Sequence, residues 1–355
     1  MNPFSTLYDF NELTAQADAL RRARFGKNTF YVLNRHINPT NVCRLRCPLC
    51  AFSCDSTDSR AYAMTLDEIV KQAQIASESG CTEVHLVSAI YPSWGFEQFY
   101  EMVRQIHLTF PALHIKAFTA IEIAWMATQM ISGSETGLQS VDYNSPAFIS
   151  SVKNVLNKLK SAGLESMPGG GAEILNDEIR AIACPKKGSA GLWLKVHQIA
   201  HELKIPTTAT MLFGMMETPE HRLEHVEKIQ KLQEQTGGFV AFIPLVFHPR
   251  GTQFAHLPAP GSFEKLRVIA ASRVALNSVA HIKAYWVSLG LEIAQVALSC
   301  GADDMDGTVC KERIHHDSGA TTPVGMTETE LKTLIRRAGF APVERDSIYG
   351  SFTQR

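Results

Sequence analysis

The sequence lacks an excess of charge of either sign. Lys and Arg number 34 against 35 Asp and Glu, which gives a formal net charge of −1 at pH 7. No broad basic field is therefore expected to attract nucleic acid or a membrane surface. The sequence also lacks an apolar run long enough to span a bilayer, and its first residues lack the pattern of a secretory signal. We therefore expect a cytoplasmic protein that acts on a small molecule and has neither nucleic acid nor membrane as a partner.

Cysteine is scarce and unevenly placed. The 355 residues contain eight cysteines, of which Cys43, Cys47 and Cys50 lie in one short segment after the apolar run 30–33. The remaining, scattered cysteines do not indicate a disulfide framework in a chain of this size. Three thiolates on one loop suit a [4Fe–4S] cluster instead, because they leave the fourth iron open for chemistry. The spacing therefore predicts a cluster with one free iron.

Other metal sites are excluded by residues that this segment lacks. Structural zinc requires a second ligand pair farther along the chain, and no such pair is found. Haem attachment requires a His directly after the second Cys of a C-x-x-C pair, and Ala51 stands there. Cys54 leaves one alternative open, because with Cys47 and Cys50 it resembles part of a ferredoxin ligand string. A cluster with four thiolates that only carries electrons is that alternative.

Strand-like apolar runs alternate with helical segments, and no internal repeat or low-complexity tract interrupts them. The alternation predicts an α/β protein with a (β/α) TIM-type barrel, full or partial, in which the iron–sulfur loop follows the first strand. The predicted strands are 30–33, 83–87, 114–118, 163–167, 207–213, 239–244 and 281–287. The predicted helices are 65–78, 96–108, 146–160, 192–203 and 219–235, with a loop at 133–145. One domain is expected over 1–355, with a helical lead-in at about 1–28 and a C-terminal extension at about 305–355.

The cysteine segment resembles a known family. Cys43, Cys47 and Cys50 match the C-x3-C-x2-C loop of the radical S-adenosylmethionine (SAM) enzymes, which follows the first barrel strand in that family. The resemblance implies a [4Fe–4S] cluster on these three cysteines and SAM bound at the free iron as a co-substrate. It also implies cleavage of SAM to a 5′-deoxyadenosyl radical by one electron, with reduced flavodoxin or ferredoxin as the donor.

A narrower resemblance, to the aminofutalosine synthases of the futalosine route to menaquinone, extends over most of the chain. The segments that carry it are 114–123, 168–173, 209–214, 235–239, 281–286, 301–308 and 315–320. It implies that the adenosyl radical adds to 3-[(1-carboxyvinyl)oxy]benzoate, with loss of the carboxylate carbon, to give 6-amino-6-deoxyfutalosine. The alternatives are a cyclic dehypoxanthine futalosine synthase-like enzyme and a non-catalytic iron–sulfur electron-transfer protein.

The resemblance also implies positions for SAM and substrate, while no catalytic residue is assigned. The turn after the second strand departs from the family pattern, because Ser88 and Ala89 replace two glycines. Either this turn approaches SAM with ordinary dihedrals or SAM lies differently. The other residues expected to contact SAM are Gly169, Gly170, Gly171, Glu173, Thr210, Leu212, Gly214 and Glu217. The candidates for binding the substrate carboxylates are His85, Lys116, Arg250 and Lys283. A tight turn for the glycines and surface ion pairs for the cations are the competing interpretations.

Overall fold

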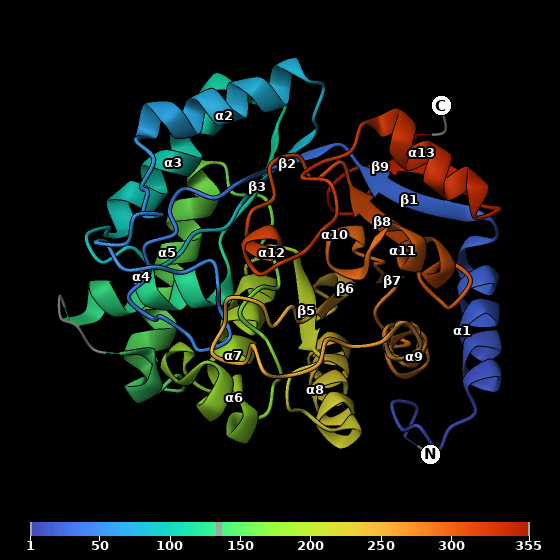
Figure 1. The fold of residues 1–355 in the computed structure, drawn as a ribbon. Coiled ribbons are helices and arrows are strands. Elements are labelled where there is room, and N and C mark those ends of the chain that lie inside the picture. The colour runs from blue at the N-terminus through green and yellow to red at the C-terminus, as the bar shows by residue number, and fades with distance from the viewer. Residues whose placement is uncertain (1, 133–136, 354–355) are drawn as a thin grey trace.

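Helices surround a ring of parallel strands in the computed structural model, which describes residues 2–132 and 137–353 (Figure 1). The strands are β1 (Asn28–Val32), β2 (Asn34–Ile37), β3 (Glu83–Leu86), β4 (His114–Lys116), β5 (Thr207–Phe213), β6 (Phe239–Val246), β7 (His281–Ile282), β8 (Asp304–Gly307), β9 (Ala341–Arg345) and β10 (Phe352–Thr353). The longer helices are α1 (Phe10–Phe25), α2 (Leu66–Glu78), α3 (Phe96–Thr109), α4 (Ala120–Ser132), α5 (Pro146–Ala162), α7 (Ala190–Glu202), α8 (Pro219–Thr236), α9 (Ser262–Ala275) and α13 (Glu328–Arg337). The shorter ones are α6 (Asp177–Ala183), α10 (Trp286–Leu289), α11 (Leu291–Ala297), α12 (Ile314–Asp317) and the 3-10 turns Leu138–Ser140 and Pro185–Lys187.

The barrel closes completely. Its sheets have the orders β2-β3-β4, β5-β6-β7 and β9-β1-β8, with β10 antiparallel on β9. Between β4 and β5, Lys116 pairs with Ser166 and Met167 pairs with Thr207, so residues 166–167 occupy the fourth strand position. A further bridge joins β7 to β8, and β8 pairs with β1. The predicted TIM-type barrel is therefore confirmed, and in its full form.

The predicted strands differ from the observed ones at three places. The first strand divides into β1 and β2 at Leu33, whose carbonyl accepts from the backbone N–H groups of Thr82 and Glu83 at 2.7 and 3.1 Å. The prediction of a full strand at 163–167 is wrong, since only two bridges form there. The prediction of a strand over 281–287 is wrong beyond Ile282, because α10 begins at Trp286. In the predicted loop 133–145, residues 133–136 lie outside the described part of the chain.

Local sequence explains where the helices begin. At α2 the Thr65 side chain accepts from the backbone N–H of Glu68, and the Glu68 carboxylate accepts from that of Thr65, which is the predicted capping box. The sequence analysis missed α4, whose residues are nearly all buried and apolar, so that no polar face marks it as a helix. None of the helices in the described residues has both the length and the apolar character needed to cross a membrane.

The end of the barrel where the strands begin is closed by the C-terminal segment. β9 runs parallel to β1, and Arg345 at its end inserts a fully buried guanidinium whose Nε donates to Asp304 Oδ2 at 2.5 Å. The Tyr349 hydroxyl donates to the same oxygen at 2.7 Å, and its ring stacks on His281 with centroids 3.7 Å apart. β8, which begins at Asp304, is thus part of the barrel, although the predicted extension started at about residue 305.

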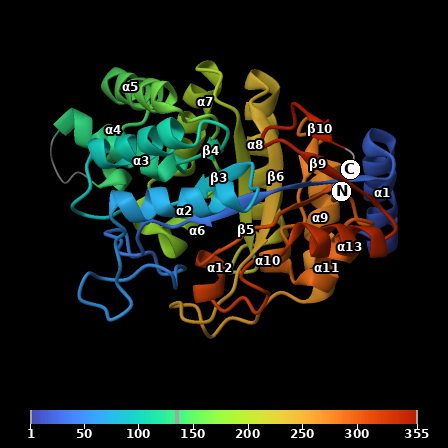
Figure 2. The ribbon, with the colours of Figure 1, turned by 90° about the horizontal axis from the view of Figure 1, so that it is seen from above.

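The opposite end carries the long loops. The loop after β2, the loop after β6 and α12 gather there, at the lower edge of the view in Figure 2. Side chains alternate in direction along each strand, so the interior of the barrel is built from every second residue. In register across β2, β3 and β4 these inward layers are Asn34–Glu83–His114 and, nearer the loops, His36–His85–Lys116. The second layer supplies the floor of the site described next.

Candidate functional site

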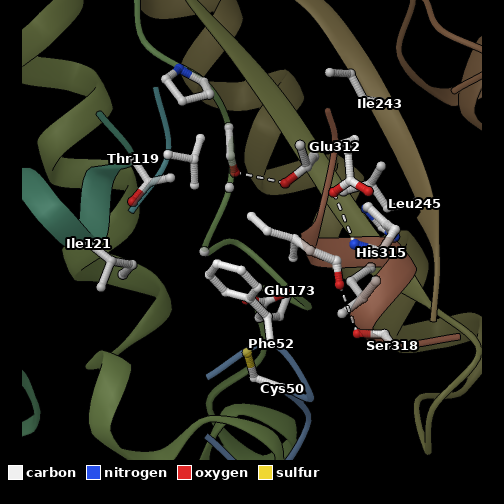
Figure 3. A pocket seen from close by; sticks show the side chains of 18 of the residues that line it. Cys50, Phe52, Thr119, Ile121, Glu173, Ile243, Leu245, Glu312, His315 and Ser318 are labelled. Atoms are coloured by element: carbon white, nitrogen blue, oxygen red, sulfur yellow. Dashed lines mark hydrogen bonds between the residues drawn. The ribbon is translucent and has the colours of Figure 1, made fainter. Parts of the chain in front are cut away.

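A cavity of about 280 Å³ lies at the end of the barrel where the strands terminate, the end at which parallel barrels carry their working loops. Its wall combines the cysteine loop, the turn after β3, the loop 168–173, β5, β6 and the segment 312–318 (Figure 3). The predicted site residues that line it are Cys43, Cys47, Cys50, His85, Ser88, Ala89, Lys116, Gly169, Gly170, Gly171, Glu173, Thr210, Leu212 and Lys283. The fold thus brings the three predicted cluster ligands and most of the predicted SAM and substrate residues to one cavity.

The three predicted cluster thiols face this cavity from one loop. Backbone hydrogen bonds fix the loop, because the Cys43 N–H donates to the Cys54 carbonyl at 3.1 Å and the Cys50 N–H donates to the Cys47 carbonyl at 3.0 Å. Arg60 donates to the Ala51 carbonyl at 3.2 Å. Burial raises the pKa of Cys47 to about 12, so this thiol ionises at neutral pH only when a metal displaces its proton.

Cys54 belongs to the support of the loop. Its side chain is fully buried, it does not line the cavity, and its backbone N–H donates to the Asn41 carbonyl at 2.9 Å. Within the described residues, no three His, Cys, Asp or Glu side chains converge on one point, as a single zinc ion would require. Three separate thiols around a cavity fit a larger cluster, in which each thiolate binds a different iron. The residues present therefore fit the predicted three-cysteine cluster.

The turn after β3 is held by a buried carboxylate. Neither Ser88 nor Ala89 has a positive φ, so the turn uses ordinary dihedrals without glycine. The Ser88 N–H donates to Glu122 Oε1 at 2.8 Å, while Glu122 Oε2 accepts from the backbone N–H and the hydroxyl of Thr119 at 2.8 and 2.7 Å. Burial raises the pKa of Glu122 to about 7. The sequence analysis missed this residue, although it lies in the matched segment 114–123.

The glycines of the loop 168–173 are required by close packing. A Cβ on Gly169 would lie 2.6 Å from the Thr208 carbonyl oxygen, and one on Gly170 would lie 2.9 Å from the Thr119 methyl group. Gly171 has φ 84°, and a Cβ there would lie 2.4 Å from Ile121 Cγ1. The glycines therefore let the loop press against the barrel, and this packing accounts for them whether or not they also contact SAM.

Thr210 and Glu173 complete this side of the cavity. The Thr210 hydroxyl donates to the Gly169 carbonyl at 2.7 Å. Glu173, with φ 47°, forms an ion pair with Lys187, which also lines the cavity. Burial lowers the pKa of Lys187, but the Glu173 carboxylate outweighs it and the pKa lies above its ordinary range. Sequence analysis missed Lys187, because nothing in the local pattern shows that this lysine points into the barrel.

Three predicted site residues do not line the cavity. Gly214 has φ 95°, and its N–H donates to Glu217 Oε1 at 2.7 Å. The Glu217 carboxylate is fully buried and pairs with Arg222 at 2.7 Å, so it holds the turn after β5 together. Arg250 lies on the exposed loop after β6. The structure thus places Gly214, Glu217 and Arg250 around the cavity without bringing them to its wall.

The predicted lysines are buried rather than on the surface. Lys116 Nζ lies 3.1 Å from Glu83 Oε2, and Lys283 forms an ion pair with Asp306. All four side chains line the cavity, and their charges balance. The interpretation of Lys116 and Lys283 as surface salt bridges is therefore wrong.

The segment 312–318 forms the wall opposite Thr119 and Ile121 (Figure 3). Glu312 accepts from the backbone N–H of His315 at 2.9 Å and from His316 Nδ1 at 2.8 Å. Glu312 and His315 line the cavity, whereas His316 does not. The adjacent histidines thus have different positions, one in the wall and one behind it.

Comparisons with known proteins agree with this geometry. Residues 37–229 match the radical SAM superfamily, and residues 236–354 match the CofH/MqnC C-terminal region. The aminodeoxyfutalosine synthase of Thermus thermophilus is 39% identical over 96% of this chain and 88% of its own. The 5-amino-6-(D-ribitylamino)uracil–L-tyrosine 4-hydroxyphenyl transferase of Methanothermobacter thermautotrophicus is 36% identical over 96% and 89%. Among solved structures, methylornithine synthase has a TM-score of 0.70 at 16% identity, covering 94% of this chain and 89% of that one, which is a likeness of fold.

Proposed function

The chain belongs to the radical SAM superfamily, whose enzymes use a [4Fe–4S] cluster and SAM, and on that premise we propose that it acts as an aminodeoxyfutalosine synthase. The reaction adds the 5′-deoxyadenosyl radical to 3-[(1-carboxyvinyl)oxy]benzoate and removes a carboxylate carbon to give 6-amino-6-deoxyfutalosine, a step of menaquinone biosynthesis. The observation that carries the proposal is the 39% identity to the T. thermophilus enzyme of that name over 96% of this chain.

Cys43, Cys47 and Cys50 are the proposed cluster ligands, because these three thiols line the cavity and Cys54 does not. When bound, the cluster and SAM supply the adenosyl radical. Around SAM we place Ser88 and Ala89 together with the loop residues Gly169, Gly170, Gly171 and Glu173 and the β5 residues Thr210 and Leu212. Gly214 and Glu217 act behind them, since Glu217 holds the turn that follows β5.

The cavity wall can protect a reactive radical. Phe52, Ile121 and Leu245 supply apolar surface, and the barrel is closed at its far end by Arg345. Exclusion of water prevents side reactions of the radical and strengthens the polar contacts that hold the substrate. The polar groups of the floor, among them His85 and Lys116, then bind the substrate carboxylates, whereas Arg250 is too exposed for this role.

A second candidate function is transfer of a 4-hydroxyphenyl group from L-tyrosine. Archaeal relatives with the name of that transferase match this chain at 36% identity, close to the value for the synthase. The two substrates differ in charge, because the enol ether carries two carboxylates and L-tyrosine carries an ammonium, a carboxylate and a phenol. Lys116 and Lys283 suit the carboxylates of the first substrate, whereas Glu83 and Asp306 suit the ammonium of L-tyrosine, so the assay below has to distinguish the two.

The proposed function is tested with the anaerobically reconstituted, reduced protein. It is incubated with SAM and either 3-[(1-carboxyvinyl)oxy]benzoate or L-tyrosine with the ribitylaminouracil, and the products are followed by mass spectrometry. We expect an adenosine adduct of the aromatic acid with release of methionine. Formation of 5′-deoxyadenosine alone with the first substrate, or of an adduct only with the second, would overturn the proposal. Cys50→Ala is the negative control, because it removes one proposed ligand.

The reaction also needs an electron and a compartment that supports an iron–sulfur cluster. We propose reduced flavodoxin or ferredoxin as the electron donor and the cytoplasm as the location. Support comes from the eight cysteines, which all lack disulfide partners, as expected in a reducing compartment. The assay above uses a chemical reductant to reduce the cluster. Replacement of this reductant by a reduced flavodoxin tests the first part of this proposal directly.

A further inference from the structure

Three neighbouring strands present polar side chains at one height above the first barrel layer. His36 on β2 is in register with His85 on β3, and His85 is in register with Lys116 on β4. Residues in register on neighbouring strands point to the same face, and all three side chains line the cavity. The rings of His36 and His85 lie with centroids 4.5 Å apart at an interplanar angle of 65°. They form a pair of imidazoles on the floor of the cavity.

Both imidazoles have an unsatisfied nitrogen. The Nε2 atoms of His36 and His85 are buried and have no hydrogen-bond partner among the residues that the structure describes. A buried polar atom without a partner costs free energy, about 1 to 3 kcal/mol, so such atoms in a cavity indicate where a ligand supplies the missing contact. Because the two rings that carry these atoms are neighbours, one ligand group can meet both.

Two buried lysines beside the pair have spare donors, next to the carboxylates of Glu83 and Asp306. Lys116 donates to Glu83, and Lys283 donates to Asp306, in each case the one hydrogen bond that the described residues offer its ammonium group. An ammonium has three N–H donors, so each lysine has donors to spare. Burial lowers the pKa of His36, and that of His85 lies well below its ordinary value, so both rings are neutral and each can still donate one hydrogen bond. Spare donors favour a ligand group that only accepts, which is a carboxylate.

The pair also lies apart from the cluster end of the cavity. His36 and His85 lie within β2 and β3, whereas the three cysteines lie on the loop that follows β2. The reacting double bond of the substrate has to face SAM at the cluster end. The carboxylate on the aromatic ring is the part of the substrate farther from that double bond, and it therefore suits the floor.

We propose that His36 and His85 form a paired-imidazole subsite that binds the ring carboxylate of the substrate, with Lys116 and Lys283 as flanking donors. The proposal rests on the function proposed above, and it adds the residues that recognise the carboxylate on the aromatic ring. His36 had no assigned role, because only the register of β2 and β3 shows that it stands beside His85.

The test measures binding of 3-[(1-carboxyvinyl)oxy]benzoate to the reconstituted holoenzyme without SAM, so that no turnover occurs. The variants are His36→Leu, His85→Leu and the corresponding Gln variants, whose side-chain amide restores a donor near the position of Nε2. We expect each Leu variant to weaken binding about tenfold or more, the usual effect of a lost hydrogen bond to a charged group, and each Gln variant to recover most of it. The analogue 2-phenoxyacrylate, which lacks the ring carboxylate, should bind with the same Kd to wild type and Leu variants.

A matched control comes from another buried histidine. His197 also has a buried Nε2 that lacks a hydrogen-bond partner in the described part of the chain, but it does not line the cavity, so His197→Gln should leave both Kd values unchanged. The change in the cluster EPR spectrum on adding SAM should be the same in all variants, which shows that the cluster end is intact. Equal binding of the dicarboxylate to wild type and Leu variants would overturn the subsite, as would an equal loss for 2-phenoxyacrylate.

Adduct formation by the wild type reports separately on the proposed function. An adduct together with His-independent binding would overturn the subsite alone. Binding that depends on the two histidines, but gives no adduct, would overturn the synthase and leave the carboxylate subsite in place. A wild type that does not bind the dicarboxylate would overturn both.

Discussion

Replacement of Glu122 by Gln tests whether a buried carboxylate holds the turn that carries Ser88. Its two oxygens accept from different backbone groups, Oε1 from Ser88 and Oε2 from Thr119, at 2.8 Å each. A glutamine offers one carbonyl oxygen and one NH2 group, so one of the two N–H donors would face another donor. Leaving a buried donor unsatisfied costs about 1 to 3 kcal/mol.

The raised pKa of Glu122 determines how the free energy of unfolding changes with pH. Burial raises the pKa of Glu122 from the ordinary 4.5 to about 7, so the folded protein binds this proton more tightly than the unfolded chain does. Stability from this group is present in full below pH 4.5 and is lost as the pH rises to about 7. Between pH 5 and pH 8 the loss amounts to about 2 to 3 kcal/mol at about 1.36 kcal/mol per pKa unit. Glu122→Gln lacks this titration.

Urea unfolding of the cluster-free chain at pH 5 and pH 8 measures the effect. We expect the free energy of unfolding of the wild type to fall by about 2 to 3 kcal/mol relative to that of Glu122→Gln between pH 5 and pH 8. Glu78→Gln, at the exposed end of α2, serves as a control and should follow the wild type at both pH values. A difference in the free energy of unfolding between the wild type and Glu122→Gln that is the same at pH 5 and pH 8 would show that Glu122 does not titrate in this range.

Three further predictions concern the cluster loop, the glycine loop and the exposed rim. Cys54→Ala should retain the iron content and the SAM-dependent EPR change of the wild type, whereas Cys47→Ala should lose cluster; loss of the cluster in Cys54→Ala would establish a fourth ligand. Gly171→Ala should destabilise the chain by about 2 to 4 kcal/mol in urea unfolding, because the added Cβ combines backbone strain at a positive φ with a steric clash against Ile121. Gly237→Ala should cost less, because Gly237 also has a positive φ but has open space where the Cβ would lie. Arg250→Ala should leave the KM for the aromatic acid unchanged, and a tenfold rise would return this residue to the substrate site.

The fold could be predicted where local signals agree. β5 was predicted with its observed bounds, because 207–213 is a β-branched apolar run, and α2 was predicted from its capping box. α4 was missed because a helix buried on nearly all sides has no periodic pattern, and 163–167 was overestimated because an apolar run of strand length does not reveal how few hydrogen bonds it makes.

The site could be predicted only in part, for a different reason. The three cysteines lie close together in the sequence, and so do the glycines of the loop 168–173. Their spacing along the chain is therefore enough to predict that they belong to the site. The partners of Lys116 and Lys283 depend on which residues stand in register across strands, and a sequence read without pairings does not contain that register. The same reason explains why three residues were missed, namely Glu122, Lys187 and His36. The role of each depends on a contact that forms only in the folded chain.

The seal formed by Arg345, Asp304 and Tyr349 at the bottom of the barrel has a consequence for the order of events in turnover. Because these contacts close the end of the barrel where the strands begin, a ligand on the floor of the cavity has to enter from the loop end. If the proposed aromatic acid binds with its ring end on the floor, it has to enter before SAM. The closed end of the barrel and the proposed site together thus predict an ordered mechanism, in which the aromatic acid binds first and SAM second.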